Sequence, residues 1–432
     1  MTDIYEIAEY TLEALKKSGA DAAQCIVSKS KKDELNVDGG KFSLMRSTFN
    51  TSISMKAIKD GKKGVTSINQ ATKEAIDEAA DQCISAAQSS VPDEAEQIAP
   101  FTAKAEYKTG VFEPELDKLF DRIEEFMSQT AAEYPKIILE QLISDYEHSE
   151  KLYMNTNGTS LKYEHGEYSF NTMFSAHEGE KASSFNGYFC ALDSLEKPFM
   201  DAGMQRQLLD ESEKQLDTVS PSEKFVGRVI YSPDCFNELL QTALENFASS
   251  GVLIDGTSPW KDALNTKVAS EKLNLRSVPL DGRTVVGQRF TSDGYPVEDM
   301  DIIIDGVLKT FILSQYGANK TGFPRSLNSG NNLEVLPGDK ALEEMISGID
   351  RGLIVNRFSG GQPSSNGDFS GVAKNSFLIE NGKVVSAVSE TMISGNIIDM
   401  LNNIVAVSKE QTTDGLSFMP WAEFDGVTVS GK

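Results

Sequence analysis

The chain has 432 residues, of which 39% are hydrophobic and 25% charged, the proportions of an ordinary globular protein. Its formal charge of −24 repels phosphate backbones, which argues against direct binding to nucleic acid. No segment approaches the roughly 18 uninterrupted apolar residues of a membrane span. The N-terminus mixes acids with its apolar residues, unlike a signal peptide. We therefore expect a cytoplasmic protein that binds neither nucleic acid nor membranes.

The four cysteines are far apart in the sequence. Cys25, Cys83, Cys190 and Cys235 form no C-x-x-C pair, so neither a disulfide framework nor a zinc ribbon is indicated. We predict reduced, mostly buried thiols.

The length favours two domains, and the polar stretch 206–224 is the best candidate for their boundary. We expect an N-terminal α+β domain over 1–218 and a C-terminal β-rich domain over 219–432. In the first half, apolar residues at helical spacing predict helices that end at Gly19, cover 76–87 and cover about 115–133, with a loop before the third helix. Strand-like runs over 23–69 and 136–194, broken by turn signals, predict one antiparallel sheet.

The second half begins with a predicted strand at 227–231, and Ser232 then starts an amphipathic helix. Seven turn signals between 281 and 382 separate short β-rich runs. This spacing favours a curled or barrel-like sheet with a few short helices, one of them near 395–403. The predicted fold class is α+β.

A zinc site is not indicated by the histidines. His177-Glu178 starts like a zinc-protease helix, but the second imidazole of that motif would fall at Lys181, and the flanking residues predict a hairpin turn. His148 and His165 also lie in the first half, and 236–432 contains neither His nor Cys. A carboxylate-only site for calcium or magnesium stays open, without an EF-hand spacing to support it. We predict no catalytic and no metal-binding residue.

Signatures of nucleophilic catalysis and nucleotide binding are also missing from the sequence. The paired acids Asp299 and Asp301 fit a solvated strand edge better than a general acid/base couple. The polar segment 359–370 is either a structural loop or a loop that presents backbone groups to a peptide.

A second polar segment runs from Glu390 to Asn396, where a predicted strand gives way to a helix. Ser394 is a good helix cap, so plain capping is one interpretation. The alternative is that the free backbone amides of this junction bind a ligand.

Four stretches of the second half resemble the TldD/PmbA family. They are 229–233 with the following helix and 257–258; 293–296 with a strand reaching Tyr316; 321–322 with Arg325; and 366–370 through 377–382 to 393–396. Weaker similarity extends through the first half, so the resemblance spans nearly the whole chain.

The resemblance implies a dimer, often of a catalytic TldD-like subunit and a PmbA (TldE)-like partner, that cleaves small or unfolded peptides. Members also carry the label "modulator of DNA gyrase". Catalytic members are expected to hold a metal through H-E-x-x-x-H on the first helix of the C-terminal domain and a Cys near the C-terminus. Here 235–246 has no His and 414–432 has no Cys, which implies a PmbA-like chain; Glu238 is treated as a surface residue.

Three hypotheses follow. The first is a noncatalytic subunit that assists a TldD-like partner, which alone would hold zinc; the others are a peptide-binding regulatory homodimer and a peptidase with an unrecognised site. The residues expected to bind a peptide or partner are Arg325, Asn366, Gly367, Asp368, Phe369, Glu390, Ser394, Gly395 and Asn396.

Overall fold

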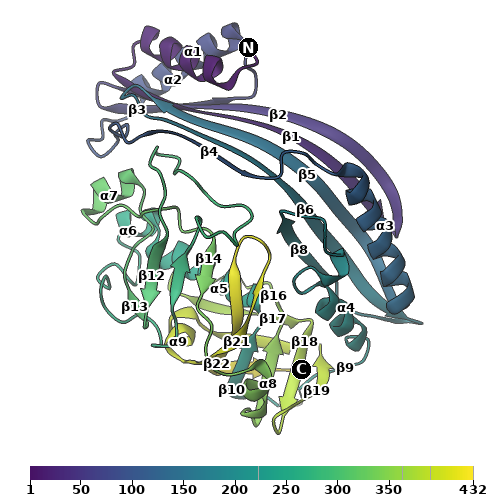
Figure 1. The fold of residues 1–432 in the computed structure, drawn as a ribbon. Helices are drawn as coiled ribbons and strands as arrows, with labels where there is room; N and C mark the ends of the chain where they lie inside the picture. Colours follow the sequence, from purple (N-terminus) through teal and green to yellow (C-terminus); the bar gives the residue numbers. More distant parts are fainter. Residues whose placement is uncertain (222, 362, 390, 432) are drawn as a thin grey trace.

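The computed structural model describes residues 1–221, 223–361, 363–389 and 391–431. An eight-stranded sheet built from the first half bends into an arch over a body made by the second half (Figure 1). We call this sheet the arch sheet. Helices and strands are mixed in the N-terminal part, and sheet dominates the C-terminal part, so the predicted α+β class is confirmed.

The arch sheet has the strand order β3-β2-β1-β5-β6-β4, and β7 and β8 pair with β6. Its strands are β1 (Ala22–Asp38), β2 (Lys41–Lys59), β3 (Lys62–Ile68), β4 (Lys104–Gly110), β5 (Ile137–Asn155), β6 (Ser160–Glu178), β7 (Lys181–Ala182) and β8 (Asn186–Leu192). The 19-residue strands β2, β5 and β6 are each about 60 Å long at the usual rise per residue. This length lets one sheet reach across the whole C-terminal body.

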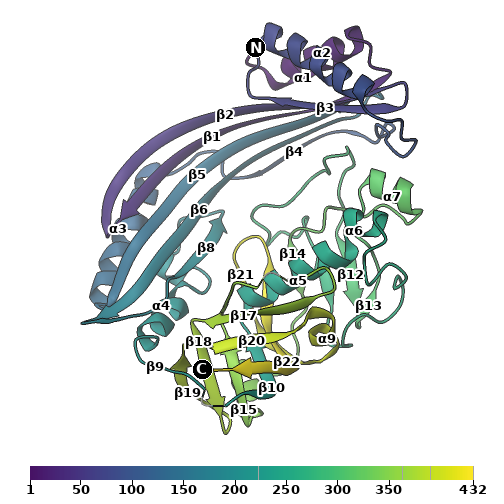
Figure 2. The ribbon, with the colours of Figure 1, turned by 180° about the vertical axis from the view of Figure 1, so that it is seen from behind.

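Three helices cover the convex face of the arch (Figures 1 and 2): α1 (Ile4–Lys17), α2 (Lys73–Ser89) and α3 (Leu116–Glu133). Side chains alternate along β1, so Cys25 and Val27 are buried in the core beneath α1 and α2. The neighbouring Ser28 and Ser30 point to the other, concave face. A Ser-lined face cannot form an apolar core, so it is free to border a cavity.

The C-terminal body is a 14-stranded mixed sheet with the main order β13-β12-β11-β14-β22-β10-β15-β18-β19-β9. Its strands are β9 (Thr218–Val219), β10 (Phe225–Tyr231), β11 (Leu275–Ser277), β12 (Met300–Ile304), β13 (Val307–Leu308), β14 (Leu333–Val335), β15 (Arg351–Val355), β16 (Arg357–Ser359), β17 (Asp368–Lys374), β18 (Ser376–Glu380), β19 (Lys383–Val388), β20 (Thr391–Asn396), β21 (Ile404–Thr413) and β22 (Phe418–Ser430). Its helices are α5 (Pro233–Ala248), α6 (Ser250–Ile254), α7 (Gln315–Thr321), α8 (Leu342–Ser347) and α9 (Ile397–Asn402).

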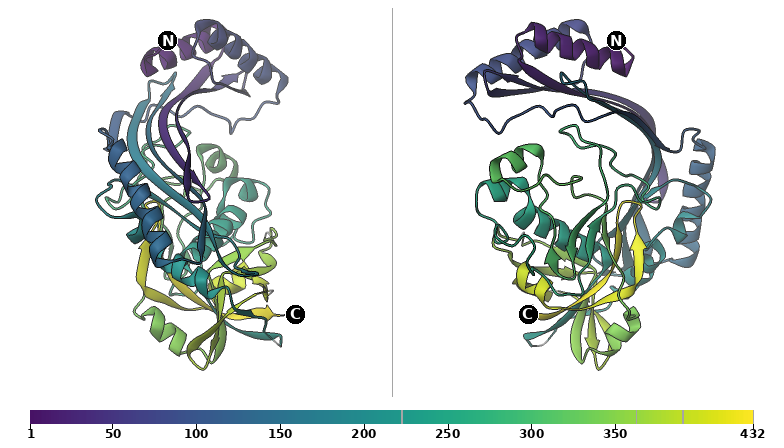
Figure 3. Two further views of the ribbon diagram at one scale, coloured as in Figure 1. Left: turned by 90° about the vertical axis from the view of Figure 1, so that its right-hand side faces the viewer. Right: turned by 60° about the vertical axis from the view of Figure 1, so that its left-hand side comes forward.

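The two parts meet at both ends of the arch (Figure 3). At one end, a hydrophobic core shared by both parts buries Phe170 and Tyr188 together with Ile354 and Trp421. The short helices η1 (Phe199–Asp201) and α4 (Gln205–Lys214) lie at this end, and α4 occupies much of the stretch expected to hold the domain boundary.

At the other end of the arch, the contacts are polar. Thr102 Oγ1 donates a hydrogen bond to the carbonyl of Gly294 at 2.7 Å, and Lys320 pairs with Asp93 at 2.8 Å. The sheet therefore bridges a space between two anchored ends.

Two expectations from the sequence are wrong. The region before the third helix is not only a loop, because β4 pairs in parallel with β6 there; its polar sequence, KAEYKTG, hid a strand that is only half buried. Tyr316 lies not on a strand but on α7, whose start is capped by Ser314. The hairpin at His177-Glu178 is confirmed, since these residues pair with Ala182 and Lys181.

All four cysteines are free and buried, as predicted. Within the described ranges, none of the helices has the length and apolar character needed to span a bilayer.

Candidate functional site

Helix α5 is the element around which the candidate site is built. Ser232 accepts a hydrogen bond from the Cys235 amide, and Pro233 occupies the first helical position, so the helix start is well defined. One side of α5 is buried, with Phe236, Leu240 and Phe247 in the core of the C-terminal body. The other side exposes what we call the polar stripe, which consists of Asp234, Glu238, Gln241 and Glu245.

Three cavities lie along the polar stripe. The largest, about 940 Å³, lies between α5 and the concave face of the arch sheet, and we call it the arch cavity. A second, of about 550 Å³, lies between the start of α5 and the strands β6 and β8. A third, of about 370 Å³, lies between α5 and the loop before β17. The stripe thus forms a wall shared by cavities of ligand-binding size.

The start of the stripe carries perturbed carboxyl groups. The pKa of Asp234 is raised to about 6, mainly by burial and also by the nearby carboxylates of Asp414 and Glu238. Burial also raises the pKa of Glu238, against the opposing effect of Arg357. Both side chains remain accessible to water inside the second cavity. Asp414 is held in place by the Leu416 and Ser417 amides, which donate to its Oδ1 at 2.9 and 2.7 Å.

The side chains of α5 do not suit a zinc ion. Asn237, Glu238 and Thr242 have the spacing of H-E-x-x-x-H. They offer an amide, a carboxylate and a hydroxyl, whereas protein zinc sites use mainly thiolate and imidazole ligands. The Asn237 amide is directed to Ser417 Oγ at 3.4 Å, and the Thr242 hydroxyl donates to the Glu238 carbonyl at 2.8 Å. Among the described residues, no group of three or more His, Cys, Asp or Glu side chains is arranged to hold a metal.

Each histidine has a partner within the arch sheet. His148 pairs with Glu164 at 3.1 Å and His165 with Glu167 at 3.1 Å. His177 Nε2 lies 2.9 Å from Ser175 Oγ.

The structure brings most of the predicted binding residues together. Strand β17 pairs with β20 so that Asp368, Phe369 and Ser370 face Asn396, Gly395 and Ser394. The Asp368 carboxylate accepts hydrogen bonds from the amides of Asn396 and Asn366, each at 2.9 Å. These two bonds hold the pKa of Asp368 below its usual value. We call the paired segments 366–370 and 394–396 the Asn-Asp cluster.

The Asn-Asp cluster adjoins the third cavity through Phe369, which lines it opposite Glu238 and Gln241. Gly367 packs against Phe247 of α5, with φ at +92°, and a Cβ added there would lie 3.1 Å from the Phe247 ring. The cluster is therefore packed onto the helix that carries the polar stripe.

Other predicted residues lie elsewhere or play different roles. Ser394 is not a helix cap; it lies in β20, and Asn396 caps α9 by accepting from the Ile398 amide at 2.9 Å. Arg325 contacts Tyr295 rather than the Asn-Asp cluster: the central carbon of its guanidinium lies 3.9 Å from the centroid of the Tyr295 ring. Arg325 lines none of the three cavities. Glu390 lies outside the described residues.

The concave face of the arch sheet was missed as part of the site. The pairing registers align Ser52, Ser28, Lys151 and Tyr163 in one row across β2, β1, β5 and β6. All four line the arch cavity. The available signal was the pair Ser28 and Ser30, two small polar residues on one face of the strand, opposite the face that carries the buried Cys25 and Val27.

Comparison with known proteins gives the class of this molecule. Residues 224–431 match the model of the PmbA/TldA metallopeptidase C-terminal domain, and residues 23–87 match that of PmbA/TldA metallopeptidase domain 1. The fold matches that of TldE from Thermococcus kodakarensis, with a TM-score of 0.83, 22% identity and coverage of 98% of this chain and 100% of that one. A protein from Bacteroides thetaiotaomicron, named as a candidate modulator of DNA gyrase, matches with a TM-score of 0.84, 23% identity and full coverage of both chains.

Sequence relatives give the same result. Metalloprotease PmbA of Escherichia coli O157:H7 is 32% identical over 155 residues, which are 35% of this chain and 34% of the relative. A zinc metalloprotease TldD homologue of Saccharolobus solfataricus is 28% identical over 195 residues, 42% of this chain and 44% of the relative. The aligned segments thus span well under two thirds of these curated relatives. With both domain models matched, the chain belongs to the PmbA/TldD family.

Proposed function

We propose that this chain is a noncatalytic, PmbA/TldE-like subunit that binds small or unfolded peptides in the arch cavity. In this proposal it works in the cytoplasm beside a TldD-like catalytic subunit, and zinc belongs to that partner. The observation that carries the proposal is the polar stripe of α5, which faces three cavities yet offers no imidazole or thiolate. Peptide binding is supported by the arch cavity, whose volume of about 940 Å³ and mixture of hydroxyl, amide and aromatic groups suit a short peptide.

Metal content and peptidase activity together test the noncatalytic role. The purified chain is incubated with zinc, desalted and analysed by mass spectrometry, and peptide cleavage is measured with and without a TldD-like protein from the same genome. We expect near-zero zinc and no cleavage by the chain alone, and faster cleavage by the mixture. About one tightly held zinc per chain, or cleavage by the chain alone, would contradict the proposal.

Glu238 separates the noncatalytic role from a solitary peptidase. It is the acid of α5 in the second and third cavities whose pKa is raised by burial, so a peptidase that acted alone could use it as a general base. We expect Glu238→Gln to leave the cleavage rate of the mixture within about twofold of the native rate, because no reacting group depends on this carboxylate. A loss of 100-fold or more would assign Glu238 a catalytic role.

The mass of the chain in solution separates the partner hypothesis from the homodimer. Light scattering of the chain alone, of the TldD-like protein alone and of their mixture shows which dimer forms. A mixed dimer supports the proposal, while a stable homodimer that never exchanges with the TldD-like protein favours a regulatory peptide-binding protein.

A further inference from the structure

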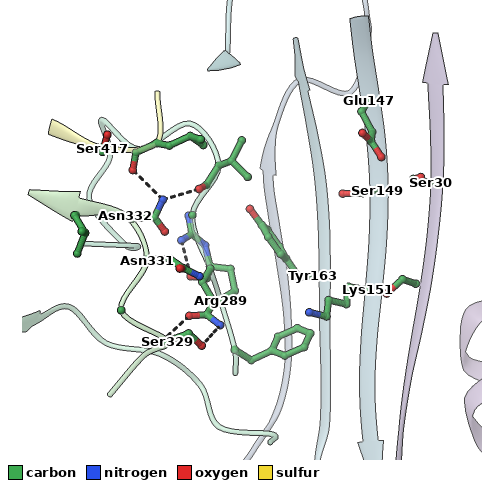
Figure 4. A pocket seen from close by; sticks show the side chains of 18 of the residues that line it. Ser30, Glu147, Ser149, Lys151, Tyr163, Arg289, Ser329, Asn331, Asn332 and Ser417 are labelled. Carbon is green, nitrogen blue, oxygen red and sulfur yellow. Dashed lines mark hydrogen bonds between the residues drawn. The ribbon is translucent and has the colours of Figure 1, made fainter. Parts of the chain in front are cut away.

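The arch cavity contains a lysine without an acidic partner. Lys151 projects from β5 into the cavity toward the loop 286–290 (Figure 4). Within the described ranges its ammonium makes no hydrogen bond or ion pair, and it lies 5.8 Å from the centroid of the Phe290 ring. Burial lowers the pKa of Lys151, as expected for a charge that has lost water and gained no counterion.

A second cation, from the loop 286–290 of the C-terminal body, approaches the same row of the sheet. Lys151 is paired in register with Tyr163 of β6, and the Arg289 guanidinium lies 5.7 Å from the Tyr163 ring centroid. Arg289 donates through Nη1 to the carbonyls of Pro279 and Gln288 and forms no ion pair among the described residues. The two cations therefore flank one tyrosine, and both keep donors available.

The acids of the arch cavity are either neutralised or set apart. Glu147 lies four residues from Lys151 on the same strand, about 13 Å away along it, and pairs with Lys32 at 3.2 Å. Glu150 points to the opposite face and pairs with Lys162 at 2.7 Å. Asp414 is bound by backbone amides, and Glu245 lies on α5 at the other wall of the cavity.

Hydroxyl groups complete the surroundings of Lys151. Ser28 is its partner in register on β1, and Ser52 is the partner of Ser28 on β2. Cations with adjacent hydroxyl donors are the usual recognition set for a carboxylate. Although the chain has a formal charge of −24, neither of these two cations has an acidic partner among the described residues, so both are available to an anionic ligand.

We propose that Lys151 and Arg289 bind a carboxylate of the peptide that occupies the arch cavity, with Ser28 as a further donor. This inference rests on the proposed peptide binding and adds the substrate class to it: peptides that present a free carboxylate to the concave face of the arch. The carboxylate belongs to the peptide C-terminus or to an acidic side chain.

Three synthetic octapeptides of Ala, Ser and Gly with an N-terminal fluorophore test the inference by fluorescence anisotropy. The first ends in a free carboxylate, the second in an amide, and the third in an amide with one internal Glu. We expect the first or the third to bind the native chain at least about tenfold more tightly than the second, since hydrogen bonds to charged groups are worth that much or more. Whichever of the two binds more tightly identifies the source of the carboxylate.

Variants test the assigned residues. Lys151→Met keeps the apolar stem but removes the charge, so the preference for the carboxylate should fall to about twofold or less. Lys162→Met is the matched control, because it removes a lysine from the opposite face of the same hairpin and should keep the preference. Arg289→Lys keeps a cation but loses the guanidinium fork, and an intermediate preference is expected.

The outcomes separate this inference from the proposed function. Equal binding of all three peptides to the native chain would overturn the carboxylate site and leave peptide binding intact. An unchanged preference in Lys151→Met, with native thermal stability, would also overturn it. Binding of none of the three peptides would overturn both.

Discussion

Glu211 is a buried carboxyl group at the contact between the two parts of the molecule, and its protonation makes the stability of the chain depend on pH. It lies on α4, where the amides of Asn356 and Gln207 donate to its two oxygens at 2.6 and 2.8 Å. Asn356 belongs to the C-terminal body, so its hydrogen bond joins the two parts. Burial raises the pKa of Glu211 from 4.5 to about 7. The folded state therefore favours the protonated form.

The raised pKa has a defined consequence for stability. The folded chain binds more protons than the unfolded chain between pH 4.5 and about 7, so the free energy of unfolding falls as the pH rises through this window. Glu211→Gln removes the ionisable group and should raise the free energy of unfolding at pH 8 by up to about 3 kcal/mol, with a smaller gain at pH 5. Denaturant titrations at the two pH values measure this; an equal change at both would show that charge is not the cause.

The side chain of Ser232 defines where helix α5 begins. Its hydroxyl accepts from the Cys235 amide at 3.4 Å and donates to the Asn356 carbonyl at 3.1 Å. The first turn that it caps carries Asp234 into the second cavity. Loss of the cap should therefore loosen the start of the polar stripe before it affects the rest of the helix.

Ser232→Ala should lower the free energy of unfolding by about 1–2 kcal/mol, the usual cost of losing such a cap. Thr242→Ala is the control, because Thr242 lies in the middle of the same helix and is partly exposed; its replacement should change stability by less than about 0.5 kcal/mol. Guanidinium denaturation compares the two variants. Equal losses of stability in the two variants would show that the capping hydrogen bond contributes no stability of its own.

The molecule as a whole depends on the arch being fixed at both ends. At the polar end, the loop 292–294 fits against the sheet: the Gln24 amide donates to the Ser292 carbonyl at 3.2 Å and Thr102 donates to Gly294. Gly294 has φ at +89°, and a Cβ there would lie 2.3 Å from the Tyr153 ring. A glycine is thus required for the close approach that keeps the arch cavity bounded.

Gly294→Ala should cost about 2 kcal/mol or more, from backbone strain and the clash with a fully buried Tyr153. Gly282→Ala is the control, since no atom lies within 4 Å of the added Cβ. Thermal unfolding measures the stability, and small-angle scattering measures whether the radius of gyration grows as the arch separates from the body. A Gly294→Ala variant as stable as Gly282→Ala would show that this contact is dispensable.

The local patterns of the sequence predicted a large part of this structure. The helical spacing of α1, α2 and α3, the start of α5 and the hairpin at His177 follow from periodicity, capping and turn chemistry, which act over a few residues. The α+β class followed from these elements. The resemblance to the TldD/PmbA family depended on short motifs and is confirmed by the matched domain models. The parallel strand β4 and the short helix α7 escaped prediction, because their sequences carry little periodic signal of their own.

The candidate site was only partly predictable. The Asn-Asp cluster was indicated because its two segments each carry small polar residues at a junction, but its peptide or partner binding stays a prediction. The cap of α9 fell on Asn396 rather than Ser394, since the pairing of β17 with β20 extends through Ser394 and delays the helix start. Arg325 was grouped with the cluster on sequence motifs, and its stacking on Tyr295 places it elsewhere.

By itself, the sequence determined that the segment 236–432 has no imidazole or thiol to offer a metal, and that the run 23–69 contains strands. Only the tertiary structure decided that the face of β1 with Ser28 and Ser30 borders a cavity, and that Lys151 and Arg289, from different halves of the chain, lie beside the same tyrosine, Tyr163. The physical reason is distance along the chain. Periodicity and capping are set by neighbours a few residues apart, whereas strand register and the docking of two sheets depend on packing between segments that the sequence keeps far apart.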